Sequence, residues 1–519
     1  MNNLAVNTDV MERIQSPMST ATILPVIRGM LDAFHKSNII YCHWKSNEHL
    51  GASMLGDTDL DILFDEQCQE SIQRILNDFG FKKFVSIAEK QYRDIEDFIG
   101  LDKRAGKIVH VHAHFKLTLG ESHLKGYQLS VERQILESRL FDMEFGIYRI
   151  APAFEMILLY FRFALKIRNR DILRFYFKRH AGYSKNILRE YTWLRSRCTN
   201  EEIRVLLASL FPNYVGIHNL VINEFSFRVL LNLSRLLHKQ FRSQRLYSPV
   251  KAKLLRWYRE IYIKVARKVE RFSNLPILSQ RVHPQDGFVV ALVGADGSGK
   301  STIVQDLKTT FKKKIDVYDV YMGRGRSGQK SWQRKILKYF KNSYLKRKQP
   351  TTKTTGQHIN SYARTSFKST LFRCLEALTV ARERRKKLRL IQAAKKKGML
   401  VICDRYPQNQ LMGYNDGPVL SNLLRCPNLL FRFLARREAK VYQIAEENPP
   451  DIVFKLIADA ALIALRKSGR ASLETLELKI EGVRRLEFSK NCNVVTIDAG
   501  RPFADVVRSV KSDLWSAWG

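Results

Sequence analysis

Residues 294–302 have the types and spacing of a loop that wraps nucleotide phosphates. The stretch reads GADGSGKST and lies between an apolar run and a helix-like pattern. Its glycines let successive backbone N–H groups turn toward phosphate oxygens, and the start of the helix adds a positive end. In this pattern Lys300 reaches the β- and γ-phosphates and Ser301 holds Mg²⁺, so the predicted cofactors are ATP and Mg²⁺. The residues predicted to contact them are Gly294, Asp296, Gly297, Ser298, Gly299, Lys300, Ser301 and Thr302.

A second apolar run ends in an acid and an arginine, Asp404 and Arg405, within MLVICDRYPQ. In an open parallel sheet, ligands bind at the carboxyl ends of the strands, which is where these two side chains are expected. A carboxylate there orients Mg²⁺ or its waters, and a guanidinium clamps a phosphate with two N–H groups. Ser301 and Asp404 are therefore predicted metal ligands. The alternative is a buried ion pair that serves the structure alone.

Together, GADGSGKST and DRY resemble the thymidylate kinase family of nucleoside monophosphate kinases, over residues 286–519. DRYPQ, NDGP and PPDIVFKL further resemble a divergent group of thymidylate kinase-like proteins. The resemblance implies a P-loop fold, ATP and magnesium, and phosphoryl transfer to a nucleoside monophosphate. It also implies that Asp296 touches the acceptor's sugar, that Arg405 grips its phosphate, and that a mobile lid carries arginines. The expected catalytic residues are accordingly Lys300, Asp404, Arg405 and Asp296.

Basic residues after the fourth expected strand are candidates for that lid. Arg466, Lys467 and Arg470 follow it, with Arg484 and Arg485 further along. Arginines that close over the transferring phosphoryl group neutralise its oxygens, which accelerates transfer by several powers of ten. We predict that Arg466 and Arg470 are catalytic, and a solvated basic helix face is the alternative.

The expected acceptor pocket departs from that family. Where its members usually carry an REPGG-like segment, this chain reads YMGRGRSGQKSWQRK. No Asp or Glu occurs between Asp319 and Glu376, whereas fourteen Lys or Arg residues do. An amphipathic helix is expected there, with an apolar stripe of Trp332, Ile336, Phe340 and Tyr344. We expect segment 320–375 to border a large or anionic acceptor, or one presented at a membrane. A stripe that packs in the core is the alternative.

A second set of chemistry-bearing residues lies near the N-terminus. Asp59 and Asp61 begin an apolar strand, and alternation places both carboxylates on one face, where they would share Mg²⁺. With Ser46 upstream, this spacing resembles the nucleotidyltransferase superfamily. Two features differ: Lys45 replaces a usual glycine, and histidines occupy the strand expected to carry a third carboxylate. These histidines are His110, His112 and His114, and alternation directs them all to one face.

Several interpretations of the chain are left open by these motifs. The N-terminal domain is either an active nucleotidyltransferase, a degenerate domain that binds nucleotide or a partner, or a structural turn. Its histidines form either a metal site or ordinary core and surface positions. For the whole chain we expect a Mg²⁺- and ATP-dependent phosphotransferase. The alternatives are a nucleotide-controlled module that binds nucleic acid or membrane, and a bifunctional enzyme of surface polysaccharide synthesis.

Three regions must position these residues. Residues 20–135 alternate short apolar runs with helical patterns, which predicts a nucleotidyltransferase-like α/β domain. Residues 136–285 are helical, basic and aromatic, and end in a turn-rich linker. In 286–519, strand-like runs alternate with helical lengths, which predicts a parallel sheet covered on both faces, the α/β fold of a P-loop kinase. The expected strands are 288–293, 316–321, 399–403, 452–457 and 494–497.

Composition narrows the class of protein. The 519 residues carry a net charge of +38, which favours a polyanionic partner such as nucleic acid, an acidic glycan or an anionic membrane surface. The seven cysteines are scattered and form no C-x-x-C pair, so neither a disulfide framework nor a zinc site is indicated. No signal peptide or membrane-spanning run is apparent. A cytoplasmic location is expected, with peripheral membrane contact as an open option.

Overall fold

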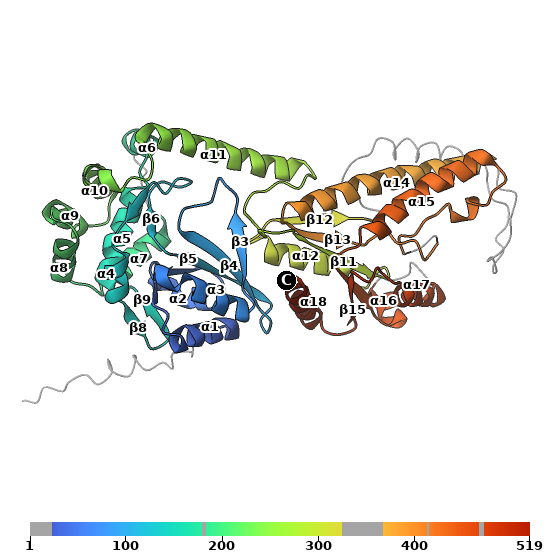
Figure 1. The fold of residues 1–519 in the computed structure, drawn as a ribbon, viewed down its shortest axis with the longest axis horizontal. Helices are drawn as coiled ribbons and strands as arrows, with labels where there is room; N and C mark the ends of the chain where they lie inside the picture. The colour runs from blue at the N-terminus through green and yellow to red at the C-terminus, as the bar shows by residue number, and fades with distance from the viewer. Residues whose placement is uncertain (1–22, 179–182, 324–366, 413–414, 467–471) are drawn as a thin grey trace, which may run out of the picture. The chain divides into compact units, whose positions relative to one another are not determined.

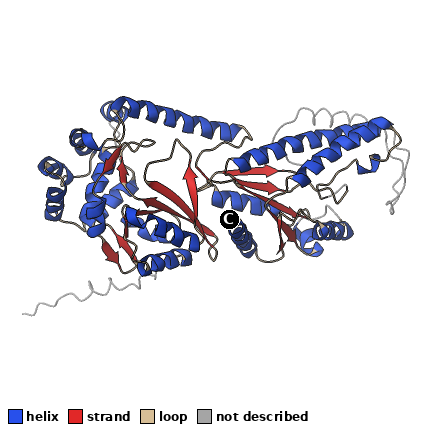
Figure 2. Cartoon of the chain, viewed as in Figure 1, coloured by secondary structure: helices blue, strands red, loops and turns tan. Residues whose placement is uncertain are grey.

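The computed structural model describes residues 23–178, 183–323, 367–412, 415–466 and 472–519. The chain divides into two compact units, Met1–Val265 and Ala266–Gly519 (Figure 1). Both units combine strands with helices (Figure 2), which confirms the predicted α/β fold class. None of the helices in the described ranges is long and apolar enough to cross a bilayer. The amphipathic helix predicted in segment 320–375 falls in 324–366, outside the described residues.

The N-terminal unit is built on a mixed sheet in which its strands follow the order β3-β4-β5-β2-β1-β9-β8. Their bounds are β1 (Tyr41–His43), β2 (Leu60–Phe64), β3 (Lys82–Ser86), β4 (Ile95–Asp102), β5 (Lys107–His114), β8 (Leu140–Asp142) and β9 (Ile147–Arg149). Strand β2 pairs in parallel with β5, and Asp61 lies directly opposite His112. The acids of one strand therefore lie beside the histidines of the next. A separate hairpin joins β6 (Leu117–Leu119) to β7 (Tyr127–Leu129).

Helix α5 (Pro152–Ala164) connects this sheet to the helical part of the unit. Every side chain from Phe154 to Phe161 is buried, so the helix is covered on nearly all sides. Its apolar side chains belong to the same core as Cys42 and Leu63 of the strands. The other helices of this unit are α1 (Pro25–Lys36), α2 (Leu50–Met54), α3 (Gln69–Asp78), α4 (Glu132–Glu137), α6 (Asn169–Lys178), α7 (Lys185–Arg195), α8 (Asn200–Leu210), α9 (Tyr214–Val221) and α10 (Phe227–Gln240). Helix α11 (Pro249–Phe272) follows them and runs past the boundary between the units.

The C-terminal unit is built on a five-stranded sheet in the order β12-β13-β11-β14-β15, and every neighbouring pair is parallel. The strands are β11 (Phe288–Gly294), β12 (Val317–Tyr321), β13 (Leu400–Asp404), β14 (Ile452–Ile457) and β15 (Asn493–Asp498), within one residue of the expected bounds. Strand β11 is buried along its whole length, as expected for the centre of a sheet covered on both faces. The helices are α12 (Lys300–Phe311), α14 (Phe367–Lys396), α15 (Leu429–Glu447), α16 (Ala460–Arg466), α17 (Leu473–Arg485) and α18 (Phe503–Ala517).

A buried polar contact ties α5 to the segment after β1. Glu155 is 1% exposed, and its carboxylate accepts hydrogen bonds from the Asn47 backbone N–H at 3.0 Å and from the Asn47 side-chain amide at 2.8 Å. Burial raises the pKa of Glu155 to about 7, although the hydrogen bonds from Asn47 oppose this rise. The folded N-terminal unit therefore retains a proton that an unfolded chain would release.

We expect the N-terminal unit to lose stability as the pH rises from the ordinary glutamate value of 4.5 to about 7. In that window the folded state binds more protons than the unfolded state, so a higher pH favours unfolding. Glu155→Gln should flatten this part of the pH profile, which urea unfolding at several pH values measures. The control is Glu137→Gln, at the exposed end of α4, which should leave the profile unchanged. A profile that Glu155→Gln does not flatten would contradict the assignment.

Candidate nucleotide-binding site

The predicted phosphate loop connects β11 to α12, and its glycines are required by the backbone. A Cβ on Gly294 would lie 2.6 Å from Ser298 Oγ and 2.8 Å from Leu456 O, so a larger residue does not fit. Gly297 and Gly299 have φ angles of +104° and +90°, in the left-handed region that favours glycine. The chain therefore passes from strand to helix through a turn that other residue types would strain.

Lys300 opens α12, and Ser301 and Thr302 continue its first turn. The Lys300 side chain turns back over the loop, where Nζ donates to the backbone carbonyls of Gly294 at 3.0 Å and Ala295 at 2.6 Å. Lys300 is only 5% exposed, and burial lowers its pKa to about 8. A lysine with this pKa is still mostly protonated at pH 7, so it can meet a phosphate as a cation.

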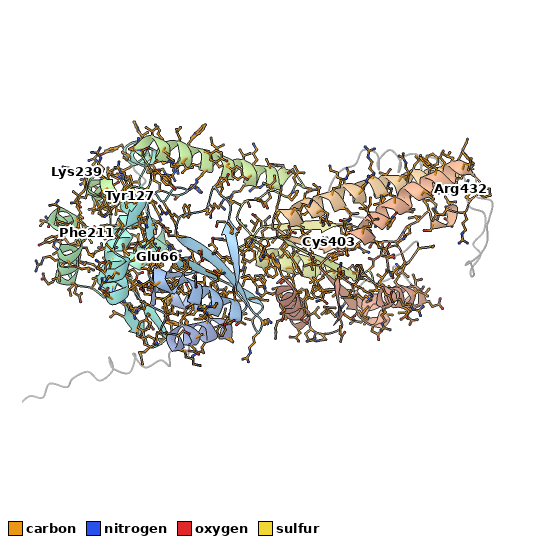
Figure 3. All side chains as sticks on the ribbon, in the orientation of Figure 1. Glu66, Tyr127, Phe211, Lys239, Cys403 and Arg432 are labelled. Atoms are coloured by element: carbon orange, nitrogen blue, oxygen red, sulfur yellow. The ribbon has the colours of Figure 1, made fainter. Side chains whose placement is uncertain are left out.

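Asp404 lies at the carboxyl end of β13, immediately after Cys403, which Figure 3 labels, and directly opposite Leu292 of β11. Its Oδ2 accepts a hydrogen bond from Ser301 Oγ at 2.6 Å. Its Oδ1 is buried and accepts no hydrogen bond from any part of the chain that the structure describes. A hydroxyl and a carboxylate oxygen are ligands that Mg²⁺ prefers, and a buried carboxylate oxygen is stabilised by a cation. The two predicted metal ligands thus lie together and fit that role.

Arg405 joins the phosphate loop to the segment that follows β13. Its φ of +74° is left-handed, which costs a non-glycine residue on the order of 1–3 kcal/mol. The guanidinium forms ion pairs with Asp296 of the loop and with Asp416, whose Oδ2 lies 3.0 Å from Nη1. The Asp296 side chain is 42% exposed, whereas that of Asp416 is 9% exposed. The structure therefore brings Asp296 and Arg405 together and leaves Asp296 on the accessible side.

A buried arginine that was not predicted from the sequence also holds this arrangement. Arg384 of α14 is 2% exposed, and its Nη2 lies 3.0 Å from Asp416 Oδ1. The same guanidinium donates to the Met322 carbonyl at 3.0 Å and to the Tyr442 hydroxyl at 2.6 Å. Arg384 continues the buried stripe of α14, three residues after Ala381. An arginine on an otherwise apolar helical stripe was the available signal.

The described contacts do not join the predicted lid arginines to this loop. Arg466 ends α16, and its guanidinium donates to the Ala499 carbonyl at 3.0 Å. The two arginines at the end of α17 pair with Glu481 of their own helix. Arg470 lies in 467–471, outside the described residues, so its role stays a prediction.

In the N-terminal unit, His110 bridges two carboxylates. Its Nδ1 lies 2.9 Å from Asp59 Oδ1, and its Nε2 lies 2.9 Å from Asp97 Oδ1 on β4. Ser46, which the nucleotidyltransferase resemblance places near the acids, donates to Glu190 Oε1 at 3.3 Å. An imidazole nitrogen thus lies close to Asp59, and Asp97 is a carboxylate that was not predicted from the sequence.

Asp61 has three nitrogen neighbours around its Oδ1: Lys45 Nζ at 2.7 Å, His112 Nδ1 at 2.9 Å and His114 Nε2 at 3.5 Å. Burial disfavours the charged form of Asp61, but Lys45 and the two histidines outweigh it and hold the pKa well below its ordinary value. Burial lowers the pKa of His112 to about 4 and that of His114 well below its usual range. An ammonium group therefore balances Asp61, where the nucleotidyltransferase pattern expects Mg²⁺ shared with Asp59.

Loss of Asp416 would leave the buried Arg384 guanidinium without its carboxylate. We expect Asp416→Ala to lower the free energy of unfolding of the C-terminal unit by about 3–5 kcal/mol, because an uncompensated charge stays buried. Urea unfolding measures this loss. The control is Asp319→Ala, which breaks only a partly exposed pair with Lys308 and should cost less than about 1 kcal/mol. Equal losses of free energy of unfolding in the two variants would contradict this prediction, because the buried Asp416 pair would then stabilise the unit no more than a partly exposed pair does.

Part of the chain is similar in sequence to proteins described as ATP-binding. No family model matches the sequence. The chain is 25% identical over 234 residues to the uncharacterized ATP-binding protein YghR of Escherichia coli K12, which covers 44% of this chain and 88% of that protein. It is 27% identical over 224 residues to YghS of the same strain, over 43% of this chain and 90% of that one.

Among solved structures, the thymidylate kinase of Candida albicans is 16% identical with a TM-score of 0.25, over 44% of this chain and 90% of that one. A deoxyadenosine kinase of M. mycoides with bound dATP is 18% identical with a TM-score of 0.25, over 43% of this chain and 98% of that one. Each of these similarities extends over less than half of this chain.

Proposed function

We propose that the C-terminal unit is a Mg²⁺- and ATP-dependent phosphotransferase of the P-loop kinase type. The observation that carries this proposal is the Ser301–Asp404 hydrogen bond of 2.6 Å, formed beside a glycine loop that Lys300 closes. Similarity to two Escherichia coli proteins described as ATP-binding supports it. The parallel sheet supports it as well, because its carboxyl edge is where such folds bind ligands.

The donor-side roles follow from position and charge. Loop N–H groups and Lys300 bind the phosphates of ATP, and Lys300 exchanges its bonds to the Gly294 and Ala295 carbonyls for phosphate oxygens. Ser301 and Asp404 hold Mg²⁺, which when bound neutralises charge on the transferring phosphoryl group. Phosphoryl transfer depends mainly on such positioning and charge stabilisation. The donor side is therefore assigned to the loop N–H groups, Lys300, Ser301 and Asp404.

The acceptor side is assigned to the Asp296–Arg405 pair. Arg405 is held from within by Asp416, whereas its other partner, Asp296, is the more exposed of the two. An anionic acceptor group therefore competes with Asp296 for the guanidinium, which binds oxyanions with paired N–H groups. Asp296, once released from Arg405, would accept a hydrogen bond from an acceptor hydroxyl. This arrangement gives the loop acid a role in acceptor binding.

The acceptor is proposed to be anionic and large. Thymidine monophosphate is not assigned as the acceptor. The segment 320–375 contains fourteen Lys or Arg residues and no acid, and it begins in β12, where Tyr321 lies opposite Asp404. A segment of this composition favours ligands with several negative charges.

We expect Lys300→Ala to weaken ATP binding and to lower ATP-dependent phosphorylation by at least about 100-fold, because a preorganised cation at the phosphates is lost. The measurement uses labelled ATP with a panel of nucleotides, sugar phosphates, nucleic acid and glycan extracts. The control is Lys308→Ala, a lysine of the same helix that pairs with Asp319. If Lys300→Ala binds ATP and transfers phosphate like the wild type, the proposal is wrong.

Asp404→Asn tests the metal ligand separately. The asparagine keeps the shape of the side chain but loses the charge that attracts a divalent cation, so we expect the Mg²⁺ concentration for half-maximal activity to rise at least about tenfold. Titration of activity with Mg²⁺ at saturating ATP measures the shift. Asp319→Asn, on the neighbouring strand β12, should leave the titration unchanged. An unaltered Mg²⁺ requirement in Asp404→Asn would remove Asp404 from the site.

A further inference from the structure

Three side-chain atoms in the N-terminal unit converge on one point. Asp61 Oδ1 lies 2.9 Å from His112 Nδ1 and 3.5 Å from His114 Nε2, and the two imidazole nitrogens are 3.2 Å apart. A tetrahedral metal ion with bonds of about 2.0–2.1 Å separates its ligand atoms by about 3.3–3.4 Å. The observed triangle therefore has nearly the dimensions of one face of a tetrahedral coordination sphere.

The sheet holds these three residues in place before any ion binds. Asp61 and His112 face each other across the parallel pair β2 and β5, and His114 lies two residues further on the same face. His114 is fully buried, whereas the side chains of Asp61 and His112 are 14% and 15% exposed. The site is thus rigid on its inner side and retains access from solvent through its outer two ligands.

Several nitrogens surround one carboxylate oxygen in this cluster. His112 Nδ1 lies 2.9 Å and Lys45 Nζ 2.7 Å from Asp61 Oδ1, and His114 Nε2 lies 3.2 Å from His112 Nδ1. A neutral imidazole has one nitrogen with a free lone pair, so with Lys45 turned away both rings can direct a lone pair to the point that Asp61 Oδ1 faces. A divalent cation at that point can be coordinated by all three atoms together.

We propose that Asp61, His112 and His114 form a binding site for one zinc-class divalent ion. Two imidazoles and one carboxylate favour such an ion over Mg²⁺, which prefers oxygen ligands. Three protein ligands leave the fourth position open to water or to an anionic ligand. The scattered cysteines had indicated no zinc site, and this one is built from histidines instead. It differs from the Mg²⁺ pair expected at Asp59 and Asp61, because Asp59 lies beside His110 and outside the triangle.

Lys45 competes with the ion for Asp61. Its ammonium lies 2.7 Å from Asp61 Oδ1, where it supplies the positive charge that a metal ion would supply. The two cations repel each other at this distance, so the ion binds only when Lys45 turns away. The Lys45 side chain is long and 22% exposed, which lets it do so without disturbing the core.

The test is a titration of the full chain with Zn²⁺ by calorimetry, and with Co²⁺ by visible absorption. We expect one ion per chain and the absorption bands of tetrahedral Co²⁺. His112→Gln and His114→Gln should weaken Zn²⁺ binding at least about 100-fold. Lys45→Met should strengthen it at least about tenfold, because a competing charge is removed. Lys300→Ala should leave it unchanged, which separates this site from the proposed kinase activity.

The matched control is His110→Gln, on the same strand and the same face but outside the triangle, which should keep full Zn²⁺ affinity. Thermal unfolding identifies any variant that fails to fold, and the Co²⁺ spectrum of the unmodified chain does not depend on variants. The proposal is overturned if neither the wild type nor Lys45→Met binds one Zn²⁺. It is equally overturned if both folded variants, His112→Gln and His114→Gln, retain binding, or if His110→Gln alone abolishes it.

Discussion

A row of alternating charges, formed by Asp296, Arg405, Asp416 and Arg384, is the constraint on which the C-terminal site depends. Arg384 is buried in α14, and a buried guanidinium is stabilised by a carboxylate beside it. Asp416 meets that need and thereby fixes the segment after β13. That segment in turn holds Arg405 against the phosphate loop in a left-handed backbone conformation. A buried helix arginine thus determines where an accessible arginine lies.

Local sequence patterns predicted which loop and strands form this site. The glycine loop, the five parallel strands and the position of Asp404 at a strand end follow from spacing and from apolar periodicity. The partners of Arg405 did not follow, because Asp416 meets Arg384 across 32 positions of the chain. Such pairing depends on how α14 packs against the segment after β13, which periodicity does not encode. NDGP, which contains Asp416, was visible only as a resemblance.

In the N-terminal unit, too, the sequence pattern predicted the faces of a strand but not the contacts between distant segments. Alternation predicted that the three histidines of β5 share a face. It did not predict that Lys45 neutralises Asp61, because these residues come from different segments. Periodicity predicted residues 136–285 to be helical, which is wrong for β8 and β9 because these two short strands join the sheet of the N-terminal unit. The shared core of α5 and the strands depends instead on the apolar surface that surrounds this helix, which needs a second layer to cover it.

The hydrogen bonds from Lys300 to the Gly294 and Ala295 carbonyls have a consequence for ligand choice. They give the lysine two neutral acceptors before any nucleotide arrives. A ligand can replace these carbonyls as the hydrogen-bond acceptor of Lys300 only if its own acceptors bind the ammonium more strongly. Anionic phosphate oxygens do so, because charge-assisted hydrogen bonds are stronger than those to neutral carbonyls. Only a phosphate chain long enough to extend to Nζ presents them. Under the proposed function, the loop therefore favours nucleotides whose phosphates extend to Nζ.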